Sequence, residues 1–207
     1  MHLTELNLVD LLAAFRSPDP TPGGGSASAL AGAVGASLLA MVAGLPKSRA
    51  ATEEDVERLA AAASRCADAS ARLAALVDRD AEAYDMVVSA FRKPKGTDGE
   101  KAARQQAIQE AMTVATGTPL AVMRACGDAI EQAAVVAAFG NRNAASDLQV
   151  GLELLGAGLR GARSNVDINV GSLKDATYAE HAGREAERLT TEATTEIAAA
   201  RAALERS

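Results

Sequence analysis

The stretch that decides the fold is PTPGGGSASALAGAVGASLLAMVAGL, residues 20–45. It carries no charged residue, and from Ala27 onward it is nearly continuous apolar sequence. Ala is the best helix former, so we expect a helix that begins near Gly24 and ends around Gly44. The length would suffice to cross a membrane. Because Ala, Gly and Ser gain little from transfer into lipid, we expect instead a buried central helix in a bundle, with no membrane as partner.

The composition supports long, closely packed helices and excludes several other classes. Of the 207 residues, 49 are Ala, only 5 are aromatic, and none is Trp. A β-sandwich or barrel needs β-branched and aromatic residues to cover its faces. Proteins that bind single-stranded nucleic acid by stacking need aromatic platforms. The small side chains of this chain indicate helices that approach one another closely.

Turn and cap residues divide the chain into helical blocks. Pro119 is expected to kink or interrupt the fourth of them, because proline removes a backbone donor. Thr52 opens a capping sequence with acidic residues in the first turn. The expected blocks are 3–15, 24–45, 52–91, 100–118 with a continuation over 120–139, 143–170 and 173–205. The prediction is an all-α, up-and-down bundle of five or six long helices, forming a single domain over residues 1–207.

Charge and cysteine usage limit the partners and the compartment. The formal net charge is −6, which argues against nucleic acid, because neutralising phosphates requires a basic surface. The two cysteines, Cys66 and Cys126, form no CxxC pair, so we expect them to be reduced. The first residues include neither a basic segment nor an apolar one of the kind a signal peptide has. We therefore expect a cytoplasmic protein.

Acid–base chemistry in this chain is expected to use a carboxylate. There are only two histidines, and the Cys, His and Glu spacings typical of metal sites are missing, so we expect no metal. Asp80 and Tyr84 share one face of the predicted helix 52–91, beside Val77 and Val88. A carboxylate on an apolar face is costly unless it is paired or functional. The neighbouring Asp78, Glu82 and Asp85 fall on another face and fit a solvated charged surface.

The glycine-rich turn before the second block admits two interpretations. Gly23, Gly24 and Gly25, followed by Ser26, would leave bare amide N–H groups at a helix N-terminus, where an anionic or carbonyl ligand can bind. The alternative is a tight turn that lets two helices cross. The sequence matches neither a phosphate-binding GK[ST] loop nor a GxGxxG turn after a strand. The residues alone leave both interpretations open.

Two further polar clusters are candidates for ligand contacts. Asn141, Arg142 and Asp147 lie in GNRNAASD, where Asp147 either caps the next helix or points into a cleft. Asn165 and Asn169 are four residues apart in an otherwise apolar turn. Buried amides need partners, so these two either bridge helices or hold a polar ligand.

Six segments together resemble the cyclodeaminase/cyclohydrolase family over about residues 8–189. They are PTPGGGSASALAGAVGASLLAMVAGL, LVDRDAEAYDMVVSAFRKPK, EKAARQQAIQEA, TPLAV, GNRNAASDLQV and NVDIN, in the family's order. The resemblance implies an all-helical homodimer that handles one-carbon units on tetrahydrofolate without a metal or other cofactor. The family's DxDAxA(Y/F) motif assigns catalysis to its second Asp, which is Asp80 here. The family often has LPK where this chain has Lys93-Pro94-Lys95, so any apolar contact of that leucine is in doubt.

The resemblance implies one of two reactions, which these residues do not distinguish. A cyclohydrolase adds water to the methenyl carbon of 5,10-methenyltetrahydrofolate, and the adduct opens to 10-formyltetrahydrofolate. A cyclodeaminase closes formiminotetrahydrofolate and releases ammonia. The chain lacks a formiminotransferase domain, which favours the cyclohydrolase. Both reactions need a proton shuttle, for which we expect Asp80 with a raised pKa. The residues expected to position the substrate are Gly23, Gly24, Gly25, Ser26, Tyr84, Lys95, Asn141, Arg142, Asp147, Asn165 and Asn169.

A non-enzymatic helical scaffold is the remaining alternative. It would account for the Ala-rich helices but not for three consecutive glycines or for the position of Asp80. Failure to bind folate would favour it. The smooth face of residues 27–45 is a candidate for helix contacts within one chain or between the two chains of the implied dimer, and the sequence leaves this choice open.

Overall fold

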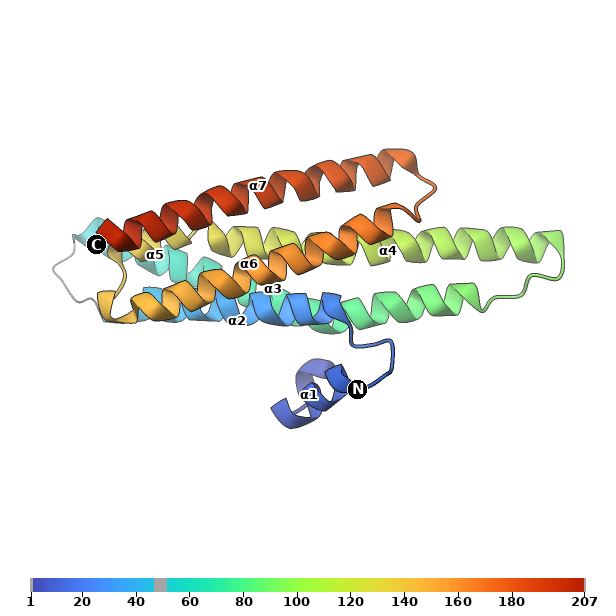
Figure 1. Ribbon diagram of the computed structural model, residues 1–207, viewed down its shortest axis with the longest axis horizontal. Helices are drawn as coiled ribbons and strands as arrows, with labels where there is room; N and C mark the ends of the chain where they lie inside the picture. Colours follow the sequence, from blue (N-terminus) through green and yellow to red (C-terminus); the bar gives the residue numbers. More distant parts are fainter. Residues whose placement is uncertain (1, 47–51, 207) are drawn as a thin grey trace.

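The computed structural model describes residues 2–46 and 52–206, and in these ranges it contains helices and no strand. Long antiparallel helices form an elongated bundle (Figure 1). The all-α prediction is confirmed, with five long helices among the described residues and two short ones. The α-helices are α1 (Leu8–Arg16), α2 (Gly24–Gly44), α3 (Glu53–Phe91), α4 (Asp98–Ile130), α5 (Ala133–Phe139), α6 (Ala145–Val170) and α7 (Ala176–Arg206), and the 3₁₀ turns are η1 (Leu3–Glu5) and η2 (Arg142–Ala144).

The expected start of α3 is confirmed by its cap. The Thr52 side chain accepts from the backbone N–H of Asp55, and the Asp55 side chain accepts from the backbone N–H of Thr52. Thr97 and Glu100 make the same reciprocal pair at the start of α4. Each pair satisfies donors that a helix start leaves without intrahelical partners.

Of the two expected effects of Pro119, a kink or an interruption, the interruption is wrong, because α4 runs through Pro119 to Ile130. The ring nitrogen of Pro119 has no proton to donate to the carbonyl of Ala115, four residues earlier. That carbonyl instead accepts a hydrogen bond of 2.7 Å from Nδ2 of Asn169 on α6. A neighbouring helix thus replaces the missing bond, and the chain breaks later, between α4 and α5.

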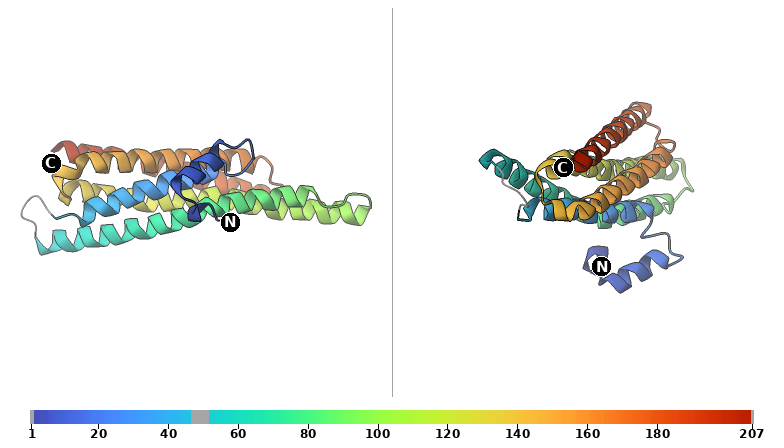
Figure 2. Two further views of the ribbon diagram at one scale, coloured as in Figure 1. Left: turned by 90° about the horizontal axis from the view of Figure 1, so that it is seen from below. Right: turned by 60° about the vertical axis from the view of Figure 1, so that its left-hand side comes forward.

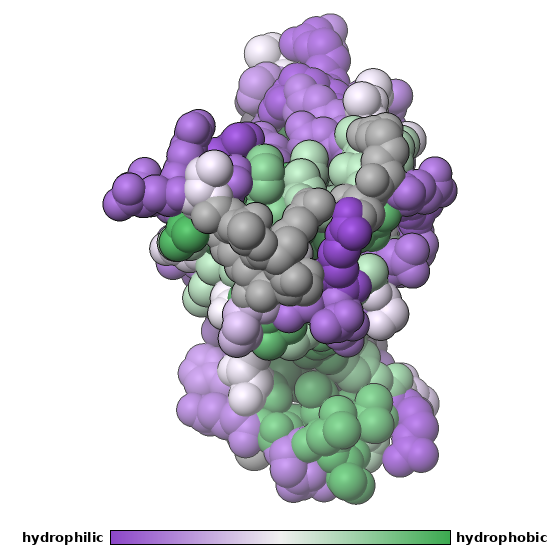
Figure 3. Space-filling model, turned by 90° about the vertical axis from the view of Figure 1, so that its left-hand side faces the viewer, coloured by the Kyte–Doolittle hydropathy of each residue, from purple (hydrophilic) through white to green (hydrophobic). Residues whose placement is uncertain are grey.

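The predicted first helix, 3–15, is divided in two. Asn7 caps α1 by accepting from the N–H of Asp10, so the helix restarts there after η1. The η1 turn is fixed to α3, because Asp78 accepts hydrogen bonds from the backbone N–H of Leu3 and from Oγ1 of Thr4. Beyond this attachment α1 makes no extensive contact with any other described element, and it stands off from the bundle (Figures 1 and 2). Figure 3 shows hydrophobic surface gathered on this lower lobe.

Helix α2 packs between α3 and α6, and glycines bring it close to α6. A Cβ at Gly158 would lie 2.7 Å from the carbonyl oxygen of Ser28, and one at Gly35 would lie 2.7 Å from the carbonyl oxygen of Gly151. Real Cβ atoms essentially never come that close, so these positions require glycine at this spacing. Small residues therefore set the distance between the two helices.

Helix α2 was expected to be a buried central helix, and it is buried on one side. By length and composition α2 is the one described helix that could cross a membrane, and half of its most apolar window is buried in the bundle. Its buried side includes Ala29, Ala36 and Leu39. The opposite side is exposed and carries apolar side chains, among them Val34 and Met41.

Candidate active site

The candidate site lies beyond the N-terminal end of α2, in the same groove between α3 and α6 that α2 occupies. Helix α2 begins at Gly24, whereas its neighbours α3 and α6 run on past that level. The space beyond the start of α2 forms a pocket of about 320 Å³ with α4 behind it. Its lining residues are Pro20, Thr21, Gly23, Gly24, Gly25, Asp80, Ala83, Tyr84, Val87, Met112, Ala115, Asn165 and Asn169.

Asp80 is the only ionisable carboxylate that lines this pocket among the described residues. Its Oδ2 accepts a hydrogen bond of 3.0 Å from Oγ of Ser26, in the first turn of α2. Burial raises the pKa of Asp80 above its ordinary value of 3.8, and this effect outweighs the hydrogen bonds from the side chain and backbone of Ser26, which lower the pKa. A carboxyl group with a raised pKa is suited to both accept and donate a proton.

The three glycines of the turn have different surroundings. A Cβ at Gly25 would lie well within 3.0 Å of the Asp80 carboxylate, whereas a Cβ at Gly24 would meet nothing within 4 Å. Gly23 precedes the helix with an extended backbone and provides no side-chain cap. The absence of a side chain at Gly25 therefore lets Asp80 lie directly against the N-terminus of α2. There the partial positive charge of the helix favours a negative group.

Three polar side chains face the pocket with atoms open to a ligand. Nδ2 of Asn165 donates to the carbonyl of Gly161 at 2.9 Å, and Nδ2 of Asn169 donates to α4 as described above. Neither Oδ1 of these amides nor the hydroxyl of Tyr84 has a partner among the described residues. The pocket thus offers two carboxamide oxygens and a phenol beside one carboxyl group.

The structure brings most of the predicted site residues together. Gly23, Gly24, Gly25, Asp80, Tyr84, Asn165 and Asn169 line the pocket, and Ser26 contacts Asp80. The sequence did not indicate the apolar wall residues, including Met112 on α4, because apolar pocket residues and core residues share the same helical spacing.

Four predicted residues lie elsewhere in this chain. Lys95 lies in the connection between α3 and α4 and does not line the pocket. Asn141 and Arg142 line a separate cavity of about 220 Å³ at the far end of α2, and Asp147 is in the first turn of α6 at that same end. A helix of the length of α2 spans about 30 Å, so placing these three in one site with Asp80 of the same chain is wrong.

The reason lies in the helix directions. In an up-and-down bundle the starts of antiparallel helices lie at opposite ends. Helix α2 starts at the pocket, and α6 runs antiparallel to it, so the start of α6 is far from the pocket and its last turns are near it. Asn141 instead caps η2, where its Oδ1 accepts from the N–H of Asn143 at 2.9 Å.

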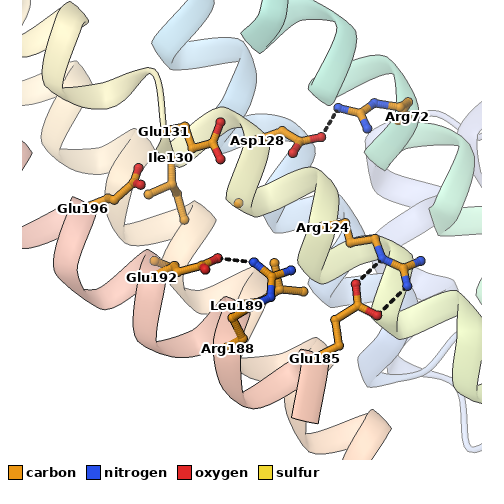
Figure 4. A pocket seen from close by; sticks show the side chains of 12 residues that line it. Arg72, Arg124, Asp128, Ile130, Glu131, Glu185, Arg188, Leu189, Glu192 and Glu196 are labelled. Atoms are coloured by element: carbon orange, nitrogen blue, oxygen red, sulfur yellow. Dashed lines mark hydrogen bonds and ion pairs between the residues drawn. The ribbon is translucent and has the colours of Figure 1, made fainter. Parts of the chain in front are cut away.

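A second cavity of about 300 Å³ lies between α4 and α7, beside α3 (Figure 4). Its charged side chains are largely paired with one another. Arg124 makes two hydrogen bonds of 2.7 Å to Glu185, and Arg72 pairs with Asp128 at 2.7 Å. The hydrogen bond from Arg124 lowers the pKa of Glu185. These pairs link the helices. Glu196 also lines this cavity, and burial together with the nearby Glu131 and Glu192 raises the pKa of its carboxyl.

The structure also bears on metal binding. Among residues 2–46 and 52–206, no three His, Cys, Asp or Glu side chains are grouped so that they could hold a metal ion. The two thiols are buried, and burial raises the pKa of both Cys66 and Cys126 to about 12. Such thiols are poor nucleophiles and poor ligands at neutral pH.

Comparison with known proteins identifies the family. A family model described as formiminotransferase-cyclodeaminase matches residues 7–188, nearly the whole chain. The chain belongs to the formiminotransferase-cyclodeaminase family. The match includes the pocket and the glycine turn, and it confirms the resemblance seen in the sequence motifs.

Relatives within the formiminotransferase-cyclodeaminase family carry two different names. A protein of Methylorubrum extorquens named methenyltetrahydrofolate cyclohydrolase is 41% identical over 177 residues, covering 86% of this chain and 85% of that protein. A formimidoyltransferase-cyclodeaminase of Rattus norvegicus is 33% identical over 89% of this chain. This chain corresponds to only 34% of the rat protein's length.

The fold of the family is also found in a solved structure. The crystal structure of a formiminotetrahydrofolate cyclodeaminase from Thermotoga maritima superposes with a TM-score of 0.85. It covers 97% of this chain and 96% of the other, at 26% sequence identity.

Proposed function

We propose that this protein is a methenyltetrahydrofolate cyclohydrolase, which converts 5,10-methenyltetrahydrofolate and water to 10-formyltetrahydrofolate. The observation that carries the proposal is Asp80, held by Ser26 at a helix start in a pocket lined with amides. The Methylorubrum relative, which matches nearly end to end, is named for this activity.

Asp80 would act as the proton shuttle. A water molecule attacks the methenyl carbon between N5 and N10, and the carboxylate takes one proton from that water as the new C–O bond forms. The protonated carboxyl then donates its proton to N5 as the bond between carbon and N5 breaks. The adduct's hydroxyl loses its proton to solvent as the C=O bond forms, which leaves the formyl group on N10 and Asp80 again ionised. The raised pKa of Asp80 suits both steps, because one group has to be base and then acid.

The remaining pocket residues would bind and orient the substrate. The pterin ring system has N–H donors that fit the open oxygens of Asn165 and Asn169. The hydroxyl of Tyr84 and the amides at Gly24 and Gly25 would contact the polar edge near the reacting carbon. Lys95 does not line the pocket, and it would contact the substrate only if the glutamate tail of folate extends out of the pocket toward the connection between α3 and α4. No metal or further cofactor takes part in this proposal.

The second candidate is formiminotetrahydrofolate cyclodeaminase activity. The specific observation in its favour is the close similarity in fold to the Thermotoga enzyme of that name. In this reaction N10 attacks the formimino carbon on N5, and ammonia leaves after receiving a proton. Asp80 would again move the proton, because both reactions pass through a tetrahedral carbon in the same place.

The protein would act in the cytoplasm as a homodimer. The exposed apolar side of α2 supports the homodimer.

Parallel assays with both substrates test the function. Loss of the methenyl chromophore after addition of 5,10-methenyltetrahydrofolate would support the cyclohydrolase. Formation of that chromophore from formiminotetrahydrofolate, with stoichiometric ammonia, would support the cyclodeaminase. If neither substrate reacts and no folate binds in a titration, the enzyme proposal fails and a scaffold role is favoured.

A further inference from the structure

Pro119 is buried inside α4, the helix that closes the back of the pocket. Ala115 and Met112, one and two turns earlier on the same helix, line the pocket themselves. Proline is the least favourable residue for a helix interior, because its ring clashes with the preceding turn and its nitrogen has no hydrogen to donate. The effect of Pro119 therefore falls on the carbonyl of Ala115, in the wall of the pocket.

The carbonyl of Ala115 determines which way the amide of Asn169 is turned. A carbonyl oxygen can only accept, and Nδ2 of Asn169 donates to it at 2.7 Å. The two ends of a carboxamide are similar in size, but the nitrogen donates and the oxygen accepts. Turning the amide over would set its oxygen against the oxygen of Ala115 with no hydrogen between them. The bond thus holds Nδ2 toward α4 and leaves Oδ1 open in a side chain that lines the pocket.

Asn165 provides a comparison within the same pocket. Its Nδ2 donates at 2.9 Å to the carbonyl of Gly161, which belongs to the same helix, α6. That carbonyl also has its ordinary backbone donor four residues later, because no proline interrupts the ladder there. The side-chain bond of Asn165 is therefore an additional one, whereas the bond of Asn169 replaces a backbone bond that Pro119 removes.

We infer that Pro119 is a positioning residue of the pocket: by withholding a backbone N–H from Ala115, it fixes Oδ1 of Asn169 as an acceptor for an N–H group of the substrate. This inference rests on the proposed function, in which the ligand is a pterin. A residue with an N–H at position 119 would bond to Ala115 along the helix and weaken the hold on Asn169. The amide could then turn over and present a donor to the same edge of the ligand.

A fixed acceptor affects both affinity and orientation of the ligand. An amide that is already turned correctly loses no rotational freedom when the ligand binds, which favours binding. An oxygen held toward the pocket also repels a carbonyl edge of the ring system and selects an N–H edge. Pro119 would thereby help to set the face that the pterin presents to Asp80.

Pro119→Ala and Pro119→Val both introduce the missing N–H, with side chains of different size. A contact present in the bound substrate and in the transition state alters KM and leaves kcat unchanged. Because one neutral hydrogen bond is weakened, we expect KM to rise by about 2–10-fold in both variants. Gly99→Ala is the control on α4, since a Cβ there meets nothing within 4 Å, and it should keep the wild-type KM. An unchanged KM in both Pro119 variants overturns the inference.

A double-mutant cycle tests whether Pro119 acts through Asn169. Asn169→Ala should raise KM by itself, and adding Pro119→Ala should change that KM by no more than about twofold. Adding Pro119→Ala to Asn165→Ala should instead multiply the two effects, because Asn165 is held by its own helix. Multiplication in both pairs would show that Pro119 shapes the pocket without Asn169, and would overturn the inference.

Thermal unfolding tests the hydrogen-bond exchange without reference to activity. Asn169→Ala removes the donor to Ala115 and should lower Tm by about 2–8 °C. In the Pro119→Ala background the introduced N–H satisfies that carbonyl, so the same change should lower Tm much less. Asn165→Ala should shift Tm equally in both backgrounds, because the carbonyl of Gly161 keeps its backbone donor. Equal losses from Asn169→Ala in the two backgrounds overturn the inference.

The two sets of measurements separate the inference from the proposed function. If the wild type neither binds nor converts folate, the proposed function fails, and the Tm cycle still decides whether Pro119 fixes Asn169. If the wild type converts folate and the Tm cycle shows coupling, an unchanged KM in the Pro119 variants overturns the positioning role alone.

Discussion

Replacing Gly25 by Ala should displace Asp80, whereas the same change one residue earlier should leave Asp80 in place. A Cβ at Gly25 would lie well inside 3.0 Å of the carboxylate, and a Cβ at Gly24 would have open space around it. The two positions share the same helix turn and the same pocket. The pair therefore separates contact with Asp80 from every general effect of substituting glycine.

The magnitude follows from what Gly25→Ala breaks. Asp80 has to rotate away and lose the hydrogen bond from Ser26, and a hydrogen bond to a charged group contributes about 1.5–3 kcal/mol. Alanine has a higher helix propensity than glycine, which stabilises either variant by up to ~1 kcal/mol. We therefore expect Gly25→Ala to lower the free energy of unfolding by about 1–2 kcal/mol. Gly24→Ala should leave it unchanged or raise it slightly.

Thermal unfolding and turnover measure both effects. For a chain of this size each kcal/mol shifts Tm by about 2–4 °C, so a difference of about 1–3 kcal/mol should separate the two Tm values by roughly 2–12 °C. The loss of a positioned acid–base group typically costs about 10²–10⁴-fold in rate. Gly25→Ala should show such a loss, and Gly24→Ala, which leaves Asp80 in place but adds a methyl group to the pocket wall, should lose less turnover. Equal stability and equal turnover in the two variants would refute the placement of Asp80 against Gly25.

Three further predictions concern stability. Asp80→Asn should unfold at a higher temperature than the wild type at neutral pH. Because burial raises the pKa of Asp80, the wild type loses stability as pH rises from 3.8 through the raised value. Equal melting curves at pH 7 would count against burial of the charge. Gly158→Ala should force α6 away from α2 and lower the free energy of unfolding, measured with denaturant, by about 1–3 kcal/mol. Gly183→Ala is the control, because a Cβ there meets nothing within 4 Å, and it should be neutral or stabilising. Equal losses in the two variants would contradict the close packing of α2 and α6. Arg124→Met should cost about 1 kcal/mol at neutral pH. Because Arg124 lowers the pKa of Glu185, this cost should shrink in acid as pH falls from 4.5 through the lowered value, and a pH-independent cost would argue against the ion pair.

Much of the fold could be predicted from local sequence signals. The charge-free stretch gave the bounds of α2, and Thr52 marked the start of α3. Pro119 misled, because its effect depends on Asn169, a residue fifty positions away that satisfies the freed carbonyl. Local rules describe the cost of a proline, but only the tertiary structure shows whether another helix compensates for it.

The candidate site was partly predictable for a similar reason. Asp80 could be found because its position on an apolar helix face is costly, and the glycines because three in succession are unusual. Arg142 was assigned to the same site from polarity, but the direction of α6 places it at the far end of the chain. Sequence order does not state which helix ends meet, and still less which ends of two copies meet.

The most direct test of the central claim is turnover of 5,10-methenyltetrahydrofolate by Asp80→Asn beside wild type, with folate affinity measured on both. Asparagine retains the size of the side chain and can still accept from Ser26, but it cannot shuttle a proton. If Asp80 is the catalytic acid and base, the variant should fold and bind folate with similar affinity. The rate at which the methenyl absorbance decays should be lower than in the wild type by about 10²-fold or more. A variant that binds folate and turns over at the wild-type rate would contradict the account.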